Sequence, residues 1–200
     1  YWNDAALTSE LASAYRDFVV GRGGLIVFAN GNAGDIPALR GNPSDNAALP
    51  SLSAAAADLE RGWLTVAALD PDNPTRLTDY SQACGIAMNY CLAAPGNVVF
   101  IDPAARTGDT SYSLYMGGGT SYAAPQVSGA AAVVWSAFPY FDNDLVRQTL
   151  LGTARDLGAT GVDAEFGWGL LDVGRAANGP AQFAWGDVTV SLSLIHISEP

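Results

Sequence analysis

The hydrophobic positions of the chain fall into short continuous runs and longer periodic stretches. The runs at 24–29 and 62–69 have the length of strands, and their lack of polar positions is typical of parallel strands covered on both faces. The stretch 94–101 predicts a turn that leads into a third strand. The segment between the first two runs is rich in turn-forming residues and predicts a long loop.

Three other stretches have the pattern of helices. Residues 4–20 carry apolar side chains at helical spacing, which predicts an amphipathic helix. Residues 120–138 are apolar on nearly every side and predict a helix packed all round. Gly129 within it has low helix propensity, and a close approach of another backbone there would account for it. Asp142 is the predicted N-cap of a further helix, 143–154. Strands that alternate with helices indicate an α/β fold with a mostly parallel sheet.

Composition and charge narrow the classes of function. The chain has 200 residues, 49% of them hydrophobic, which is enough for one domain or a large part of one. Its formal net charge is −11 and it contains no lysine, so a polyanion such as nucleic acid would be repelled. No apolar run reaches the roughly 20 residues that a membrane helix needs. We therefore expect neither a nucleic-acid partner nor a membrane segment in these residues.

Both ends of the sequence have an unusual character. The chain does not start with Met, and its first residues have the pattern of the middle of a protein, so we expect further sequence upstream. Residues 192–200 match the conceptual translation of a sequencing adapter, and we interpret them as read-through that is not native. A genuine β-strand is the alternative. The choice between these interpretations affects the functional prediction, because the one histidine of the chain, His196, lies in this segment and is native only if the segment is.

Ser121 is the first candidate for chemistry. It follows three glycines, 117–119, at the start of the predicted central helix, and on position alone an N-cap serine is the simpler interpretation. However, the glycines would let a substrate approach closely, and free N–H groups at a helix start would stabilise a developing negative charge. The nucleophile elbow of α/β-hydrolases does not fit, because it requires glycine where this chain has Ala123 and a native histidine downstream.

Four segments resemble, in family order, the subtilisin-like serine proteases, or subtilases. Residues 119–129, GTSYAAPQVSG, resemble the serine signature of that family. Upstream, LIVFANGNAG at 25–34 resembles the strand and turn that carry its oxyanion asparagine. LAAPG at 92–96 resembles the segment before the family's next strand, and FGWGLLDVGRA at 166–176 resembles the end of the catalytic domain. The resemblance covers about 25–176.

The resemblance implies roles for individual residues. Ser121 would be the nucleophile, and the side-chain amide of Asn32 would hold the oxyanion together with the N–H of Ser121. A turn asparagine is the alternative for Asn32, and it is the interpretation we keep for Asn30. Asn30 stands where a small residue is usual, near the expected wall of the specificity pocket, and Tyr122 stands where methionine is usual. The expected substrate-binding residues are Asn30, Gly31, Gly119 and Thr120.

Subtilases order their catalytic triad along the chain as Asp, His and Ser. The aspartate and the histidine are therefore expected upstream of Tyr1, and these 200 residues alone are expected to be inert. We assign 1–178 to the C-terminal part of an incomplete three-layer subtilisin-like domain and 179–191 to the start of a following segment. The expected function of the parent protein is that of a serine endopeptidase acting on proteins or peptides. The alternative is a catalytically dead subtilase fold that binds peptides or has a structural role at the cell surface.

The finer details resemble the autotransporter branch of bacterial subtilases. CGIAMNYCLAAPG at 84–96 and the stretch 154–183 have the character of that branch, as does FPYF at 138–141 followed by a helix. In this branch the protease is exported through an outer-membrane barrel that is encoded further downstream. The resemblance thus implies a secreted or cell-surface protein of a bacterium, with a barrel beyond these residues.

Cys84 and Cys91 enclose six residues. Zinc would need further cysteine or histidine ligands at suitable spacing, and the sequence has none. In an exported protein the pair most simply forms a disulfide, and two buried thiols are the alternative. Subtilases often bind structural calcium, but the acidic loops 70–74 and 156–165 lack the spacing of an EF-hand. We assign no metal ligand and expect no cofactor.

Overall fold

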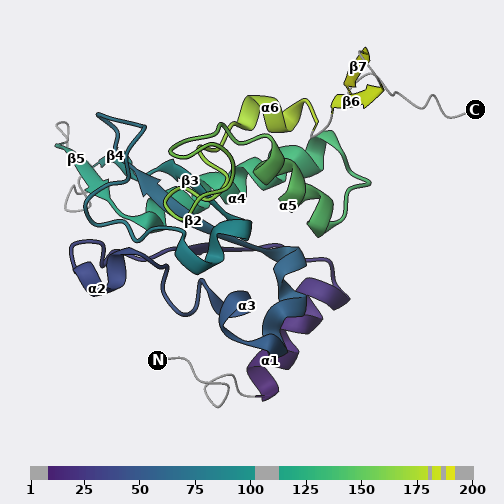
Figure 1. Cartoon of the computed structure of the whole chain (residues 1–200), viewed down its shortest axis with the longest axis horizontal. Coiled ribbons are helices and arrows are strands. Elements are labelled where there is room, and N and C mark those ends of the chain that lie inside the picture. Colours follow the sequence, from purple (N-terminus) through teal and green to yellow (C-terminus); the bar gives the residue numbers. More distant parts are fainter. Residues whose placement is uncertain (1–8, 102–112, 180–181, 186–187, 192–200) are drawn as a thin grey trace, which may run out of the picture.

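Three parallel strands form the central sheet in a computed structural model of the chain, which describes residues 9–101, 113–179, 182–185 and 188–191 (Figure 1). The strands are β1 (Ile26–Ala29), β2 (Trp63–Leu69) and β3 (Cys91–Pro95), in the order β1-β2-β3. Both pairs are parallel, with Ile26 opposite Trp63 and Thr65 opposite Cys91. The predicted α/β fold with a parallel sheet is confirmed.

One strand of the prediction is wrong. The sequence pattern places the third strand of the sheet within 94–101, but the third strand is β3, and β4 (Asn97–Ile101) pairs antiparallel with β5 (Leu114–Gly118). These two strands form a ribbon of their own, on the left in Figure 1. The run NVVFI reads as a buried strand in sequence, yet Val99 is 63% exposed. A second antiparallel pair consists of β6 (Gln182–Trp185) and β7 (Val188–Ser191).

Helices cover both faces of the sheet. Successive residues of a strand point to opposite faces, and the entirely buried strand β2 packs on both. Leu64 and Val66 contact α4 (Thr120–Ala137) and α5 (Asn143–Gly152), whereas Trp63 packs with α3 (Leu49–Leu52) and the 3-10 segment Ala54–Gly62. The remaining helical elements are α1 (Ser9–Arg16), the π-helical turn Asp17–Gly21, α2 (Pro37–Arg40), the 3-10 segment Gly85–Tyr90 and α6 (Val173–Ala177). The result is a three-layer arrangement.

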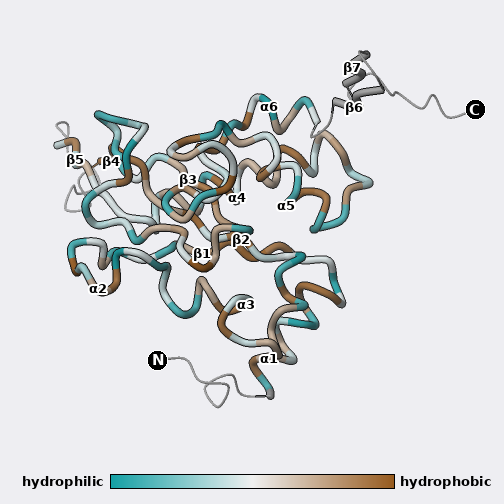
Figure 2. Tube along the Cα trace, viewed as in Figure 1, coloured by the Kyte–Doolittle hydropathy of each residue, from teal (hydrophilic) through white to brown (hydrophobic). Residues whose placement is uncertain are grey.

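Hydrophobic residues gather where these layers meet. Figure 2 shows the hydrophobic colour of β1 near the middle of the molecule, and Phe28 of this strand stacks on Trp63 with ring centroids 4.8 Å apart. Tyr15 approaches the same indole edge-on at 5.2 Å. Burial of such aromatic pairs stabilises a core beyond the area that they remove from water. This packing fixes β1, the strand that ends beside the candidate oxyanion residue.

The central helix α4 begins and ends within one residue of the predicted 120–138. It is not packed all round, because Val133 is 43% exposed although Val134 is fully buried. A side chain added at Gly129 would have no neighbour within 4 Å, so the close backbone approach expected there is wrong for the described residues. In α5 the predicted cap is confirmed, since the Asp142 carboxylate accepts a hydrogen bond from the N–H of Leu145 at 2.8 Å.

Two other expectations concern the ends of the chain. Of the helix predicted at 4–20, residues 4–8 lie outside the described residues, and the rest is formed by α1 and the π-helical turn. The segment 192–200, with His196, also lies outside the described residues. None of the helices in the described ranges has both the length and the apolar character needed to cross a membrane.

Candidate active site

Asn32 lies in the turn that follows β1. The turn begins with Asn30, whose N–H still bonds to the carbonyl of Val66 at 2.9 Å and extends the pairing of β1 with β2. Gly31 then has φ 122°, a conformation that favours glycine, and a side chain at this position would also collide with Oε1 of Gln82. The glycine therefore lets the chain reverse sharply, so that Asn32 is exposed beyond the end of the sheet.

Ser121 lies in the first turn of α4. The helix begins at Thr120, and its N-cap is Gly119, so the interpretation of Ser121 as an N-cap serine is wrong. The side chain of Ser121 is exposed, and its hydroxyl has no hydrogen-bond partner in the part of the chain that the structure describes. Because the first N–H groups of a helix have no partner within it, this end of α4 also provides donors and the positive end of the helix dipole.

Thr120 joins these two elements. Its backbone N–H and its hydroxyl both donate to Oδ1 of Asn32, at 2.8 Å and 2.9 Å. The hydroxyl in turn accepts a hydrogen bond from the N–H of Gly31 at 3.1 Å. Two donors on one atom identify that atom as the amide oxygen, because an NH₂ group would not accept them. The amide of Asn32 is thus oriented with its oxygen toward the helix and its Nδ2 free to donate elsewhere.

The hydroxyl of Ser121 and the amide of Asn32 border the same small space at Gly119. A Cβ placed on Gly119 would lie 3.0 Å from Oγ of Ser121 and 3.3 Å from Nδ2 of Asn32. The ring of Tyr122 borders this space too, with Cδ2 3.6 Å from the same point. The hydroxyl of Ser121 and the amide NH₂ of Asn32 therefore both lie beside Gly119, the proximity that acyl transfer would require of a nucleophile and an oxyanion donor.

The sequence did not predict the aromatic cluster beside Ser121, in which Tyr122 packs on the ribbon of β4 and β5. The ring of Tyr122 stacks on Phe100 of β4 with centroids 6.3 Å apart, and Phe100 also contacts Tyr115 of β5 at 5.5 Å. A Cβ on Gly117 would lie 2.7 Å from Phe100 and 3.0 Å from the hydroxyl of Tyr122, so this glycine makes room for the stack. The unusual tyrosine at 122 was the signal, but its partners become visible only in the folded chain.

The structure does not place Asn30 where the sequence suggested. Its side chain is completely buried, and Nδ2 donates to the carbonyl oxygens of Gln82 at 3.2 Å and Ala83 at 3.1 Å. Its Oδ1 accepts a hydrogen bond from the hydroxyl of Thr65. Asn30 thus stands at the start of the turn, but its side chain bonds to a distant segment instead of to the turn itself, and a direct contact of this side chain with a substrate does not fit its burial. Of the other expected substrate-binding residues, Gly31, Gly119 and Thr120 lie next to Asn32 and Ser121.

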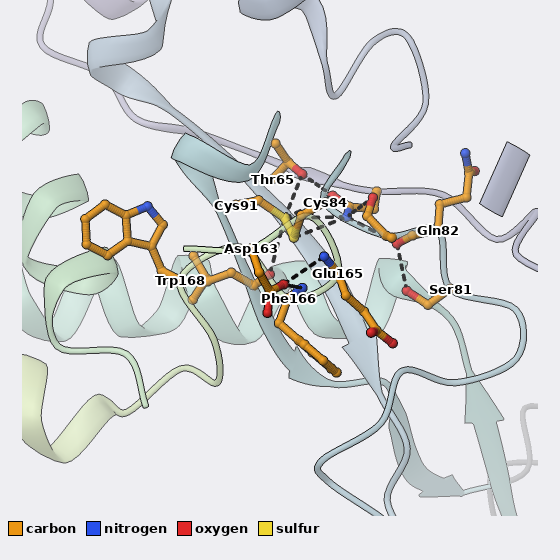
Figure 3. The surroundings of a disulfide bond; sticks show 12 residues. Thr65, Ser81, Gln82, Cys84, Cys91, Asp163, Glu165, Phe166 and Trp168 are labelled. Atoms are coloured by element: carbon orange, nitrogen blue, oxygen red, sulfur yellow. Dashed lines mark hydrogen bonds between the residues drawn. A yellow bond between two sulfur atoms is a disulfide. The ribbon is translucent and has the colours of Figure 1, made fainter. Parts of the chain in front are cut away.

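Cys84 and Cys91 form the predicted disulfide, which closes a loop with a sequence separation of 7. Both cysteines are completely buried, and Figure 3 shows the bond surrounded by Thr65, Gln82 and the segment that contains Asp163 and Phe166. The loop segment is held from outside as well, because the N–H of Gly85 donates to the carbonyl of Ala164 at 2.7 Å. The disulfide thus joins the chain before β3 to the first residue of that strand.

The acidic loops are occupied by their own hydrogen bonds. The carboxylate of Asp163 accepts bonds from the N–H groups of Ala159, Glu165 and Phe166 at 2.7–2.9 Å. In the other loop Asp70 pairs with Arg76 at 2.6 Å, and this hydrogen bond to the guanidinium lowers the pKa of the Asp70 carboxyl. Among the described residues no group of three or more His, Cys, Asp or Glu side chains is arranged to hold a metal ion.

The chain has relatives among known proteins. Residues 3–169 match the model of the subtilase family. The Neisserial autotransporter lipoprotein NalP of Neisseria meningitidis is 38% identical over 179 residues, which cover 82% of this chain and 15% of that protein. Serotype-specific antigen 1 of Mannheimia haemolytica is 36% identical, over 88% of this chain and 18% of the relative. An extracellular serine protease of Serratia marcescens is 34% identical, over 80% of this chain and 16% of the relative.

Solved structures show the same fold. The prenylagaramide maturation protease PagA superposes with a TM-score of 0.62 at 22% identity, over 85% of this chain and 55% of that chain. The patellamide maturation protease PatA gives a TM-score of 0.60 at 26% identity, over 86% of this chain and 56% of that chain. The chain spans less than a fifth of the length of NalP, of serotype-specific antigen 1 and of the Serratia protease. Since the family model matches most of its residues, the chain belongs to the subtilase family.

Proposed function

We propose that this chain is part of a serine endopeptidase in which Ser121 is the nucleophile and Asn32 stabilises the oxyanion. One observation carries the proposal: Oγ of Ser121 and Nδ2 of Asn32 lie 3.0 Å and 3.3 Å from the same point beside Gly119. Membership of the subtilase family and likeness to proteases support the reaction class.

The reaction follows from the groups on either side of that point. The hydroxyl of Ser121 attacks the carbonyl carbon of the scissile peptide bond as a histidine accepts its proton, and an acyl-enzyme forms when the amine leaves. The carbonyl oxygen becomes negatively charged in the tetrahedral intermediate. Nδ2 of Asn32 and the N–H of Ser121 donate to it, and the hydrogen bonds from Thr120 to Oδ1 keep the amide of Asn32 in the donating orientation. Water then hydrolyses the acyl-enzyme by the same steps.

The histidine and the aspartate of the triad belong, in this proposal, to residues upstream of Tyr1. The sequence contains one histidine, His196, and it follows Ser121 in the chain instead of preceding it. In the proposed organisation, 1–178 is the C-terminal part of the catalytic domain, 179–191 begins a following segment and 192–200 is not native. The matched relatives extend far beyond this stretch, which is consistent with a longer parent protein.

The 200-residue chain alone is then expected not to hydrolyse peptides, because serine without its base loses on the order of 10⁶ in kcat, the value known for subtilisin of the same family. Purified chain incubated with fluorogenic peptides tests this expectation. Turnover that disappears in the Ser121→Ala variant would overturn the claim that the base lies outside these residues.

We also propose that the parent protein acts outside the cytoplasm on protein or peptide substrates. Two relatives are named as an autotransporter lipoprotein and as an extracellular protease. The disulfide between Cys84 and Cys91 is consistent with export, because such bonds persist in oxidising compartments. By analogy with the autotransporter relative, the parent protein would continue into an outer-membrane barrel.

Labelling by a fluorophosphonate tests the proposal on the full-length protein. The reagent reacts with an activated serine, so mass spectrometry is expected to find it on Ser121 and to find none in the Ser121→Ala variant. Ser128, an exposed serine of the same helix, is the internal control and is expected to remain unlabelled. Absence of label on Ser121 in folded full-length protein would favour the alternative, a catalytically dead subtilase fold that binds peptides.

A further inference from the structure

Asn30 makes hydrogen bonds with every polar atom of its buried side chain. Nδ2 donates to the carbonyls of Gln82 and Ala83, and Oδ1 accepts from the hydroxyl of Thr65. Burial of an amide without such partners is costly, because the group loses its hydrogen bonds to water. The residue is therefore matched to a specific polar surrounding, and a small apolar residue in its place would leave the carbonyls and the hydroxyl without this partner.

The surroundings of Asn30 include the disulfide. Nδ2 lies 3.5 Å from Sγ of Cys91, and the hydroxyl of Thr65 lies 3.6 Å from the same sulfur. The two carbonyls to which Asn30 donates, those of Gln82 and Ala83, directly precede Cys84, which is bonded to Cys91 at the start of β3. Figure 3 shows Thr65 and Gln82 close to the sulfur atoms. Asn30, Thr65 and the disulfide thus form one buried cluster at the start of β3, where Cys91 pairs with Thr65 of β2.

The cluster is linked to Asn32 through Gly31. The N–H of Gln82 donates to the carbonyl of Gly31 at 3.1 Å, and the N–H of Gly31 donates to the hydroxyl of Thr120 at 3.1 Å. The turn is therefore held from two sides, by the segment before the disulfide on one side and by the start of α4 on the other. The side chain of Gln82 is itself fixed, since Nε2 donates to the carbonyls of Leu39 and Asn42 at 3.2 Å and 2.8 Å.

We propose that Asn30 is a positioning residue for the oxyanion amide, and that the Cys84–Cys91 disulfide holds the segment against which Asn30 fixes the turn. The kinetic part of this proposal rests on the proposed function. Loss of the cluster lets the turn shift, so Nδ2 of Asn32 no longer meets the developing oxyanion, while Gly119 and Thr120 at the start of α4, outside the turn, keep their places. The effect falls on kcat and leaves KM nearly unchanged, which a purely structural role would not produce.

The test compares full-length Asn30→Ala with the Cys84→Ala/Cys91→Ala double variant. We expect kcat to fall about 10- to 100-fold, in the range known for small misplacements in active sites, with KM within about twofold. Asn143→Ala is the matched control, because Asn143 is also buried and donates to two carbonyls, those of Val19 and Gly24, both at 2.8 Å. This control is expected to lower stability without changing kcat of the folded protein.

A second measurement does not depend on activity. Hydrogen exchange of the full-length protein is expected to show a loss of protection in 29–34 for Asn30→Ala and for the double cysteine variant, but not for Asn143→Ala. If Asn30→Ala does not fold, Thr65→Val removes the hydroxyl that donates to Asn30, and Thr65→Ser retains it and should restore kcat and protection.

Unchanged protection of 29–34 together with unchanged kcat in the Asn30 or Thr65 variants would overturn the proposal. An inactive unaltered protein would count against the proposed function instead, and the exchange measurement would still decide the structural part. Loss of protection in 29–34 that is confined to the Asn30, Thr65→Val and double cysteine variants supports the proposed positioning role of Asn30.

Discussion

Gly119 is the residue at which the two candidate catalytic groups meet. Its φ of 161° is extended backbone that other residues adopt, so conformational freedom does not explain a glycine here. Space does, because a side chain here would crowd both Oγ of Ser121 and Nδ2 of Asn32. The glycine of the serine signature, which the sequence showed only as a resemblance, is thus explained in the folded chain by the lack of room for a side chain.

Gly119→Ala in the full-length protein is expected to lower kcat/KM by roughly 100-fold, since the methyl group fills the space for the substrate carbonyl and displaces its neighbours. Gly129→Ala is the matched control, because its side chain meets no atom within 4 Å, and it should stabilise the helix by about 1 kcal/mol without loss of activity. Peptide hydrolysis and urea unfolding measure both variants. Full activity in Gly119→Ala would show that this space is not used by the substrate.

At the scale of elements, α4 carries Ser121 and is fixed by one apolar face against β2 and β3. Val127 and Val134 are fully buried on that face, and neighbouring Val133 is 43% exposed. The sequence did not distinguish the buried side of the helix from the exposed side, because the exposed side also carries small apolar or neutral residues such as Ala132 and Gly129. A helix anchored in this way keeps its N-terminal turn in place beside Asn32.

Val134→Ala is expected to lower the free energy of unfolding by about 2 kcal/mol, since it removes two buried methyl groups and leaves a cavity. Val133→Ala, on the exposed side of the same helix, should change it by less than about 0.5 kcal/mol. Urea unfolding followed by tryptophan fluorescence measures both. Equal losses in the two variants would contradict the orientation of α4 described above.

Tyr90, at the end of the 3-10 segment before β3, makes the free energy of unfolding depend on pH. It belongs to the hydrophobic cluster around Trp63, on the face of the sheet opposite α4. Burial raises the pKa of its hydroxyl, while the hydrogen bond with Ser51 at 2.8 Å opposes that shift. A raised folded-state pKa means that the unfolded chain loses this proton first, so the free energy of unfolding falls as the pH rises above about 10. Unfolding in urea at pH 8 to 11 should show a smaller fall in Tyr90→Phe, and an equal fall would contradict the assignment.

For the whole molecule, the sequence predicted the features that depend on local pattern. The strands β1 and β2, the span of α4, the cap at Asp142 and the disulfide were all accessible, as was the subtilase fold through its motifs. The third strand was misplaced because CLAAP is short and contains proline, whereas NVVFI has stronger β propensity but pairs in a ribbon instead.

The surroundings of Asn30 show why the rest was inaccessible. Its partners Thr65 and Gln82 lie 35 and 52 residues away, and nothing in the intervening sequence marks the pairing. The same holds for the hydrogen bonds between Thr120 and Asn32, which span 88 residues. Such contacts result from the register of the sheet and the direction of α4, which the complete fold determines.

The proposed reaction requires Ser121 and Asn32 to act on one peptide bond, and the kinetics of Asn32→Ala in the full-length protein test this most directly. We expect kcat to fall by about 10²–10³ with little change in KM, the size of effect known for the equivalent donor in subtilisin, a member of the same family. Asn46→Ala, which changes an exposed asparagine of the segment between β1 and β2, should retain full activity. An Asn32→Ala enzyme with the kcat of the unaltered protein would contradict the account.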